Sequence, residues 1–159
     1  MARGRDATLE ALYQRRVRGW AARVRSDKRL TDPDSTVTCR GAICGSVLTL
    51  DVNWAGGVVA ELGWRTRACT LTMASTAILV AAAIGQTPVQ IARAGAVLKQ
   101  LLSGTEPNFP EGWEKLEMLS PARNFPARHD SVLLPFMAME QAAADSQRSN
   151  CEPNRSVGD

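Results

Sequence analysis

Two stretches of alternating apolar and polar residues, joined by a pair of glycines, constrain the fold of this chain most. Apolar side chains occupy every second position over residues 47–54, and the pattern repeats over residues 58–65. A period of two is typical of a strand that buries one face. Gly56 and Gly57 supply the tight turn between the two stretches. The sequence therefore predicts an antiparallel hairpin.

Helical patterns flank this hairpin on both sides. Before it, apolar residues at spacings of three and four predict a first helix over residues 7–26. After it, residues 70–83 are apolar almost all round, which predicts a buried helix packed on the sheet. Thr87-Pro88-Val89-Gln90 is a capping box with proline at the first helical position, and it predicts a helix that closes at Gly104.

In the last third of the chain, the sequence predicts shorter helices and a connecting loop. We expect a short helix around Trp113, a connecting loop over residues 121–128, and a final helix over residues 132–144 with Pro135 near its first turn. The predicted fold class is α+β: a small antiparallel sheet of about three strands, with one N-terminal helix and several C-terminal helices packed on it. Residues 7–144 are expected to form a single domain, and residues 145–159 a disordered tail.

The length and composition of the chain indicate which broad class of protein it belongs to. A chain of 159 residues with 45% hydrophobic and 22% charged residues is typical of one globular domain. Its longest apolar run, residues 73–84, is too short to span a bilayer. Asp6 and Glu10 fall where a secretory signal needs an apolar stretch. We therefore expect a cytoplasmic protein whose cysteines are thiols rather than disulfides.

Basic residues crowd the first thirty positions. Such a cluster can bind nucleic acid or an acidic partner. No nucleic-acid-binding motif accompanies it, so the expected role is the solvated face of an amphipathic first helix. The residues are Arg3, Arg5, Arg15, Arg16, Arg18, Arg23, Arg25, Lys28 and Arg29.

Two of the four cysteines form the candidate site. Cys69 opens the predicted helix 70–83, where the helix dipole favours a thiolate, and Cys44 lies in the turn before the first alternating stretch. Cysteines at the ends of two connected strands can converge on one point, and thiolates bind metals and accept sulfur. The chain has no Cys-x-x-Cys zinc motif, so the spacing alone is a weak metal signal. Cys151 is expected to be a free thiol in the tail.

Several short segments carry a resemblance to a known family. They are Leu12-Tyr13, Ile43-Cys44-Gly45, Cys69-x-x-x-Met73-Ala74-Ser75, Gly85-x-Thr87-Pro88 and Phe125-Pro126-Ala127-Arg128. In order and spacing they resemble the iron–sulfur cluster scaffold family, of the IscU and SufU type and of the N-terminal domain of NifU. The spacer from residue 111 to residue 126 is more similar to SufU. The resemblance covers roughly residues 9–144.

This resemblance implies three cysteines and one aspartate around one site at the end of the sheet. Cys44 and Cys69 match two of these positions. Ser46 stands where the family has its aspartate, and Ser131 where it has its third cysteine. A neutral hydroxyl is a poor ligand for soft metals. By this resemblance the chain keeps two of the four family ligands.

Neighbouring residues offer replacements, each with a simpler alternative. His129 and Asp130 could complete a zinc or iron tetrahedron with Cys44 and Cys69, which makes these four the candidate metal ligands. Alternatively Asp130 caps a helix and His129 faces solvent. Cys39 could reach the site across the turn, or be a small buried strand residue. Cys44 and Cys69 could also be buried and inert.

The resemblance implies a scaffold or sulfur acceptor of iron–sulfur cluster assembly. A cysteine desulfurase would pass sulfur to Cys69 or Cys44, and a homodimer could share a transient cluster between its thiolates. The likeness to SufU implies a second mode, zinc-supported sulfur transfer. The alternative is a degenerate member that acts as a non-catalytic binding or regulatory partner through its arginine-rich first helix.

Other classes of function are less expected. An independent enzyme is the least expected, because one histidine and no nucleophile–base pattern leave little for acid–base catalysis. Neither a membrane nor a nucleic acid is an expected partner.

Overall fold

The alternating segments form a three-stranded antiparallel sheet of order β1-β2-β3. The structure, a computed structural model, describes residues 14–42 and 45–151. In it β2 (Val47–Ala55) and β3 (Val58–Arg67) pair across Gly56 and Gly57, whose φ angles of 62° and 83° favour glycine. β1 (Ser35–Arg40) pairs with the other side of β2. The predicted hairpin and the α+β class are confirmed.

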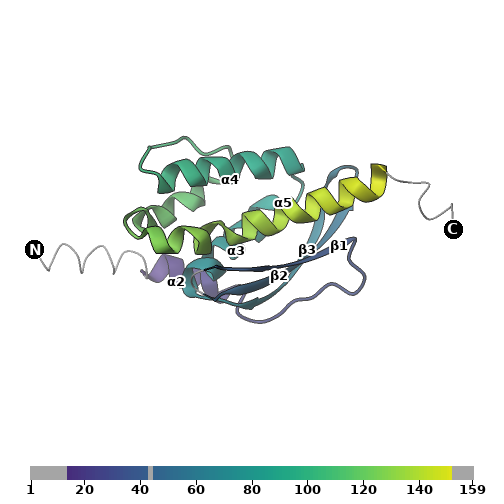
Figure 1. The fold of residues 1–159 in the computed structure, drawn as a ribbon, viewed down its shortest axis with the longest axis horizontal. Coiled ribbons are helices and arrows are strands. Elements are labelled where there is room, and N and C mark those ends of the chain that lie inside the picture. Colours follow the sequence, from purple (N-terminus) through teal and green to yellow (C-terminus); the bar gives the residue numbers. More distant parts are fainter. Residues whose placement is uncertain (1–13, 43–44, 152–159) are drawn as a thin grey trace, which may run out of the picture.

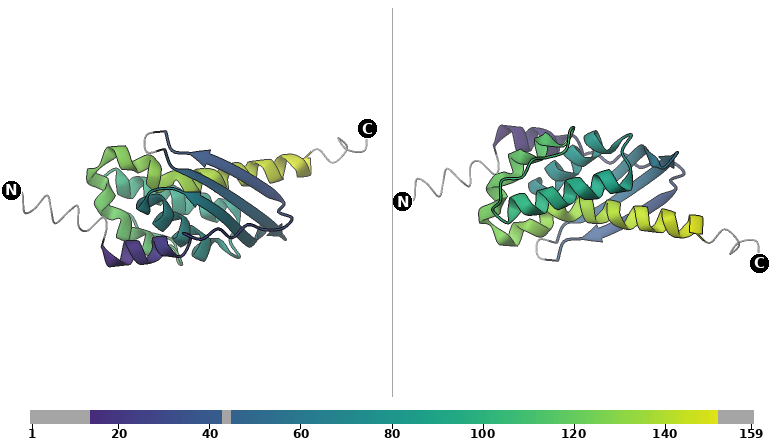
Figure 2. Two further views of the ribbon diagram at one scale, coloured as in Figure 1. Left: turned by 90° about the horizontal axis from the view of Figure 1, so that it is seen from below. Right: turned by 90° about the horizontal axis from the view of Figure 1, so that it is seen from above.

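The helices pack on one face of this sheet (Figures 1 and 2). α3 (Thr70–Ala83) and α5 (His129–Cys151) pack against each other, with α5 over β1 and β2. α4 (Pro88–Leu102) lies against α5, and α2 (Arg15–Ala22) packs against α3. The view from below in Figure 2 shows the strands in front of the helices, so no helix among the described residues covers the opposite face of the sheet. Among the residues that the structure describes, no helix is long and apolar enough to cross a membrane.

The apolar periodicity places the core as expected. The sheet contributes Val37, Leu48, Leu50, Val52 and Leu62 to it, and the helices contribute Leu71, Ile78, Leu79, Ile91, Leu98, Leu134 and Met139 among others. α3 has the predicted bounds. The capping box of α4 is confirmed: the Gln90 backbone N–H donates to Thr87 Oγ1 at 3.2 Å, and the Thr87 N–H donates to Gln90 Oε1 at 2.8 Å.

The first helix is shorter than predicted at its C-terminal end. α2 ends at Ala22 instead of continuing to residue 26, because the chain turns there and Lys28 pairs with the edge of β3 at Trp64. Val17 and Ala21 are buried while Arg15, Arg16 and Arg18 are exposed, which is the predicted amphipathic pattern. The part of the predicted helix before residue 14 lies outside the described residues.

The region before α5 differs from the prediction. Glu114–Asn124 and Pro126–Arg128 form the 3-10 segments η1 and η2, where the sequence predicted a short α-helix and a loop. Trp113 is fully buried before η1, and its ring lies 5.8 Å from that of Phe136 on α5. This contact anchors the segment by burial rather than by helical propensity.

The last helix is longer than predicted at both ends. α5 begins at His129 and continues to Cys151, instead of residues 132–144. Pro135 therefore lies in its second turn and not near its start. The division into a domain of residues 7–144 and a tail of residues 145–159 stays a prediction.

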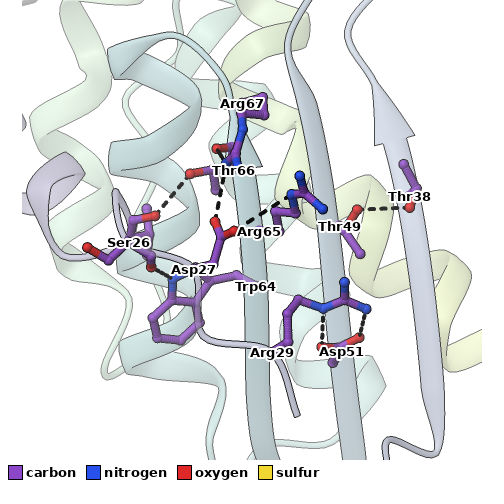
Figure 3. Close-up of polar contacts among 11 residues, drawn as sticks. Ser26, Asp27, Arg29, Thr38, Thr49, Asp51, Trp64, Arg65, Thr66 and Arg67 are labelled. Atoms are coloured by element: carbon purple, nitrogen blue, oxygen red, sulfur yellow. Dashed lines mark hydrogen bonds and ion pairs between the residues drawn. The ribbon is translucent and has the colours of Figure 1, made fainter. Parts of the chain in front are cut away.

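A buried carboxylate lies on the outer face of the sheet. Asp51 of β2 is fully buried, and its oxygens accept hydrogen bonds from Arg29 Nε and Nη2 at 2.7 and 3.0 Å (Figure 3). The Leu30 N–H and the Thr36 hydroxyl donate to it at 3.0 and 2.7 Å. Burial alone would raise the pKa of Asp51, but the hydrogen bonds from Arg29, Thr36 and Leu30 and the guanidinium charge lower it overall.

Gly63 lets the chain reach this carboxylate. Gly63 is opposite Asp51 in the β2–β3 register, and residues 28–30 pass directly over it. A Cβ at Gly63 would lie 2.6 Å from the Lys28 carbonyl oxygen and 2.9 Å from the Leu30 nitrogen. Next to this crossing, the Lys28 N–H donates to the Trp64 carbonyl at 2.9 Å, and the Trp64 N–H donates to the Lys28 carbonyl at 2.7 Å.

Candidate functional site

Cys69 lies at the junction of the sheet and the helical layer. It is the N-cap residue of α3, two residues after the end of β3, with the extended backbone angles φ −71° and ψ 166°. Its side chain is half-buried and packs against the core. The thiol thus stays partly accessible at the end of the sheet. Cys44, its predicted partner, lies outside the described residues.

The two serines at the replaced ligand positions both contact Cys69. Ser46, just before β2, accepts a hydrogen bond from the Cys69 backbone N–H at its Oγ, over 3.1 Å. The side chains of Ser46 and Ser131 also hydrogen-bond the Cys69 sulfur. Both serines are buried, with exposed fractions of 2% and 0%. The structure thereby brings together residues 46, 69 and 131, as the sequence resemblance implied.

A third hydroxyl completes this group. Thr72 Oγ1 lies 3.4 Å from Cys69 Sγ and donates a hydrogen bond of 3.0 Å to the Ser131 carbonyl. One turn further along α3, the Ser75 hydroxyl donates to the Val132 carbonyl at 2.6 Å. Two hydroxyl–carbonyl bonds therefore connect α3 to the start of α5. Sequence reasoning missed Thr72 and Ser75, although hydroxyls inside an otherwise apolar helix signal buried hydrogen bonds.

These contacts favour the thiolate of Cys69. Burial is the largest influence and by itself would raise the pKa of the thiol. Hydrogen bonds from the Thr72, Ser46 and Ser131 side chains outweigh it and lower the pKa of Cys69 below its ordinary value. The Thr72 backbone N–H also lowers the pKa of Cys69.

Cys39 has the opposite character. It lies on β1 with its sulfur 4.0 Å from Gln141 Oε1 of α5, and burial raises the pKa of its thiol. Its half-buried place on the helix side of the sheet fits the interpretation of a small strand residue. Cys69 is thus the more acidic of these two thiols.

His129 and Asp130 begin α5, next to Ser131. His129 Nε2 lies 3.1 Å from the Ala122 carbonyl oxygen and 3.3 Å from that of Arg123, so this nitrogen is directed at the end of η1. Asp130 is exposed in the first turn of α5. Within residues 14–42 and 45–151, no group of three or more His, Cys, Asp or Glu side chains is arranged to hold a metal ion. The predicted ligand set with Cys44 stays a prediction.

Comparisons with known proteins place this site in a family context. No family model matches the chain. It is 22% identical over 145 residues to the zinc-dependent sulfurtransferase SufU of Bacillus subtilis (strain 168), covering 91% of this chain and 98% of that protein. It is 22% identical over 111 residues to the iron–sulfur cluster assembly scaffold protein IscU of Streptococcus pyogenes serotype M1, covering 70% of each.

Solved structures agree with these relatives. The NifU-like protein (N-terminal) from Brucella abortus is similar with a TM-score of 0.83 and 25% identity, over 89% of this chain and 98% of that one. In sequence and fold the chain resembles the IscU, SufU and NifU scaffold family. A SUF-system iron–sulfur cluster assembly scaffold protein from Fervidobacterium islandicum AW-1 has the same fold. It is similar with a TM-score of 0.75 and 18% identity, over 84% of this chain and 98% of that one. Of the two curated relatives, SufU matches the larger share of this chain.

The donors described at this family site do not make up a zinc site. A structural or catalytic zinc needs three or four thiolate, imidazole or carboxylate ligands. Here Cys69 supplies one thiolate, and Ser46 and Ser131 supply neutral hydroxyls that are hydrogen-bonded to its sulfur. The arrangement surrounds the Cys69 sulfur with hydroxyl hydrogen-bond partners.

Proposed function

We propose that this protein accepts sulfur in iron–sulfur cluster assembly, with Cys69 as the accepting thiol. The observation that carries the proposal is the set of three hydroxyls, from Ser46, Thr72 and Ser131, that lowers the pKa of a half-buried Cys69. Thiolates are the reactive form in sulfur exchange. The similarity to the scaffold family supplies the context, and the relative SufU is named a sulfurtransferase.

The transfer needs only the thiolate and a persulfide donor. We infer that the donor is a cysteine desulfurase that carries a cysteine persulfide. The Cys69 thiolate attacks the outer sulfur of that persulfide, a new S–S bond forms on Cys69, and the S–S bond of the donor breaks. The donor cysteine leaves as a thiolate and takes up the proton that Cys69 lost, so the step has no net oxidation or reduction.

Iron and a transient cluster would be the cargo of the same site, with Cys44 as a second thiolate. This part of the proposal follows from the relative named IscU. A cluster normally takes four cysteine thiolates, so two copies of the chain would share it as a homodimer. We place these steps in the cytoplasm.

A zinc-bound form is the second candidate, because the relative SufU is named zinc-dependent. It would use Cys44, Cys69, Asp130 and His129. For His129 to ligate through Nε2, that nitrogen would have to leave the carbonyls of Ala122 and Arg123. The remaining alternative is a non-catalytic regulatory partner.

The test is sulfur loading by a purified cysteine desulfurase with L-cysteine, read by mass spectrometry of the intact protein and of its Cys69 peptide. We expect wild type and the control Cys39→Ser to gain a sulfur atom on Cys69, and Cys69→Ser to gain none there. Equal loading of Cys69→Ser and wild type would refute Cys69 as the acceptor. No loading of any variant, with the desulfurase still bound, would favour the regulatory alternative.

Metal analysis of the purified protein separates the zinc candidate. Zinc that co-purifies with wild type but not with Asp130→Ala or His129→Ala supports ligation by these side chains. Zinc content that is the same in all three proteins contradicts it.

A further inference from the structure

Five exposed cationic side chains lie beside the last residues of β3. Three come from the segment that follows α2 and two from the end of β3, and hydrogen bonds join these two segments. The Thr66 hydroxyl donates to the Val24 carbonyl and the Trp64 indole N–H donates to the Ser26 carbonyl, both at 2.9 Å. The five side chains therefore form one surface. We call it the basic strip, and it consists of Arg23, Arg25, Lys28, Arg65 and Arg67.

The basic strip carries more positive charge than the chain as a whole. It has five cations, and even with the neighbouring carboxylate of Asp27 counted, its charge exceeds the formal net charge of +3 of the full sequence. The amphipathic pattern of α2 does not account for it, because α2 ends at Ala22 and the strip begins at Arg23. Gathering like charges on one surface opposes folding by self-repulsion, so a binding role is a reason for them to be there.

Asp27 shows which chemical group the basic strip can hold. Its carboxylate oxygens lie 3.2 Å from Arg67 Nη1 and 3.7 Å from Arg65 Nε (Figure 3). These arginine side chains are 58% and 54% exposed, and ion pairs with such exposure are weak. Carboxylates of another protein can therefore compete with Asp27 for the two guanidinium groups.

The basic strip ends beside the candidate site. Cys69 follows Arg67 by two residues and Arg65 by four. A fully extended chain spans at most about 3.6 Å per residue, so the Cα atoms of these arginines lie within about 7 and 14 Å of that of Cys69. A protein bound on the strip would thus lie next to the half-buried thiol.

We propose that the basic strip is the docking surface for an acidic surface of the protein that donates sulfur to Cys69. This inference rests on the proposed function, and it adds how the donor is recognised. A protein carboxylate is favoured over a nucleic acid because the strip already holds a carboxylate and leads to a thiol. Opposite charges at the rim of an interface mainly raise the association rate and make it depend on salt.

The test measures the association rate of the purified cysteine desulfurase by stopped-flow at several NaCl concentrations. In water, a unit charge about 10 Å from an opposite charge changes this rate by about twofold. Arg65→Glu with Arg67→Glu changes the charge by four units, so association at low salt should be about tenfold slower. Near 1 M NaCl, where the screening length is about 3 Å, the difference from the unsubstituted strip should disappear.

A change at Asp27 should act in the opposite direction. Asp27→Asn removes the competing carboxylate and leaves both guanidinium groups free, so association should be about twofold faster at low salt. A purely structural role of the two ion pairs does not predict this gain. Arg65→Gln with Arg67→Gln removes two charges without placing a carboxylate beside Asp27, and it should slow association about fourfold. This pair keeps the test valid if the glutamate pair fails to fold by circular dichroism.

The matched control is Arg93→Glu with Lys99→Glu. These are exposed positions of α4, on the side of the helical layer away from the sheet (Figure 1), and their replacement changes the net charge by the same four units. The control should stay within about twofold of the unsubstituted rate, because its charges lie beyond the screening length from the strip. Equal slowing by the two glutamate pairs would mean that only net charge matters, and it would overturn the inference.

Three further results would overturn it. They are rates that do not change with the strip variants, an absence of desulfurase binding, and strip-dependent binding of a fluorescein-labelled DNA 20-mer while desulfurase association is unaffected. All rates are measured in the Cys69→Ser background, which has no acceptor thiol at residue 69. Failure of the charge dependence therefore leaves sulfur loading of Cys69 standing, and failure of that loading leaves the association rates unchanged.

Discussion

Replacing Gly63 by alanine should destabilise this protein far more than a single methyl group usually does. The added Cβ would lie 2.6 Å from the Lys28 carbonyl oxygen and 2.9 Å from the Leu30 nitrogen. Both contacts are with backbone atoms, which cannot rotate away as a side chain can. Residues 28–30 would therefore have to move off the sheet.

The magnitude follows from the contacts that this movement breaks. Lys28 and Trp64 share two backbone hydrogen bonds, and each is worth about 1 kcal/mol. Asp51 would lose the Leu30 N–H and the Arg29 guanidinium. A buried carboxylate that loses partners costs about 1–3 kcal/mol more. We expect Gly63→Ala to lower the free energy of unfolding by about 3–5 kcal/mol, a large part of the roughly 5–15 kcal/mol of a typical domain.

Urea denaturation followed by circular dichroism measures this loss. The matched control is Gly19→Ala, at an exposed position of α2 where a Cβ meets no atom within 4 Å. Alanine in a helix is favoured over glycine by about 1 kcal/mol, so the control should be stabilised. A loss below about 1 kcal/mol for Gly63→Ala would refute the close crossing of residues 28–30 over β3.

The other predictions concern charge and capping. Arg29→Met should lower the free energy of unfolding, measured by urea denaturation at neutral pH, by about 2 kcal/mol. The pKa of Asp51 is lower in the folded protein than in the unfolded chain, so the stabilisation by the Asp51 carboxylate is present above the unfolded pKa and is lost as the pH falls through the folded pKa. The difference in stability between Arg29→Met and wild type should therefore vanish in acid. A difference that persists there would contradict the ion pair. Thr87→Ala should cost about 1 kcal/mol in thermal unfolding by removing the cap of α4, and no loss would contradict the capping box. The pKa of Cys69 is also lowered on folding, so the stability of wild type relative to Cys69→Ala should rise with pH from the folded towards the unfolded pKa of the thiol. A flat difference over that range would contradict the hydroxyl contacts.

Local patterns made much of the fold predictable. The β2–β3 hairpin, α3 and the Thr87 capping box depend on residues close together in the chain, and period-two alternation or capping chemistry identifies them directly. The 3-10 segment η1 was not predictable in this way. Its conformation depends on burying Trp113 against Phe136, a contact between distant parts of the sequence.

The helix ends were missed for related reasons. α5 continues past Ala144 through polar residues that have no apolar periodicity, so the pattern that predicts the helix ends before the helix does. α2 ends early because the chain is needed at the edge of β3, and nothing near Ala22 in the sequence indicates that pairing.

The candidate site was predictable in its centre and not in its surroundings. The continuously apolar segment 70–83, which follows an alternating strand, was enough to place Cys69 at the start of α3. The resemblance indicated that Ser46 and Ser131 lie near Cys69, at positions where the family has an aspartate and a cysteine as metal ligands. Their role as hydrogen-bonding partners of the sulfur, together with Thr72, needed three segments of the chain to be placed in space.

The pairing of Lys28 with Trp64 also bears on how this protein behaves at high concentration. An exposed sheet edge is a template on which a strand of another molecule can add, and such additions begin fibrils. At Trp64 the edge of β3 is already engaged by two backbone bonds, with the Arg29–Asp51 ion pair beside them. An incoming strand would have to displace both before it could add there, so this crossing protects the protein against aggregation from that side.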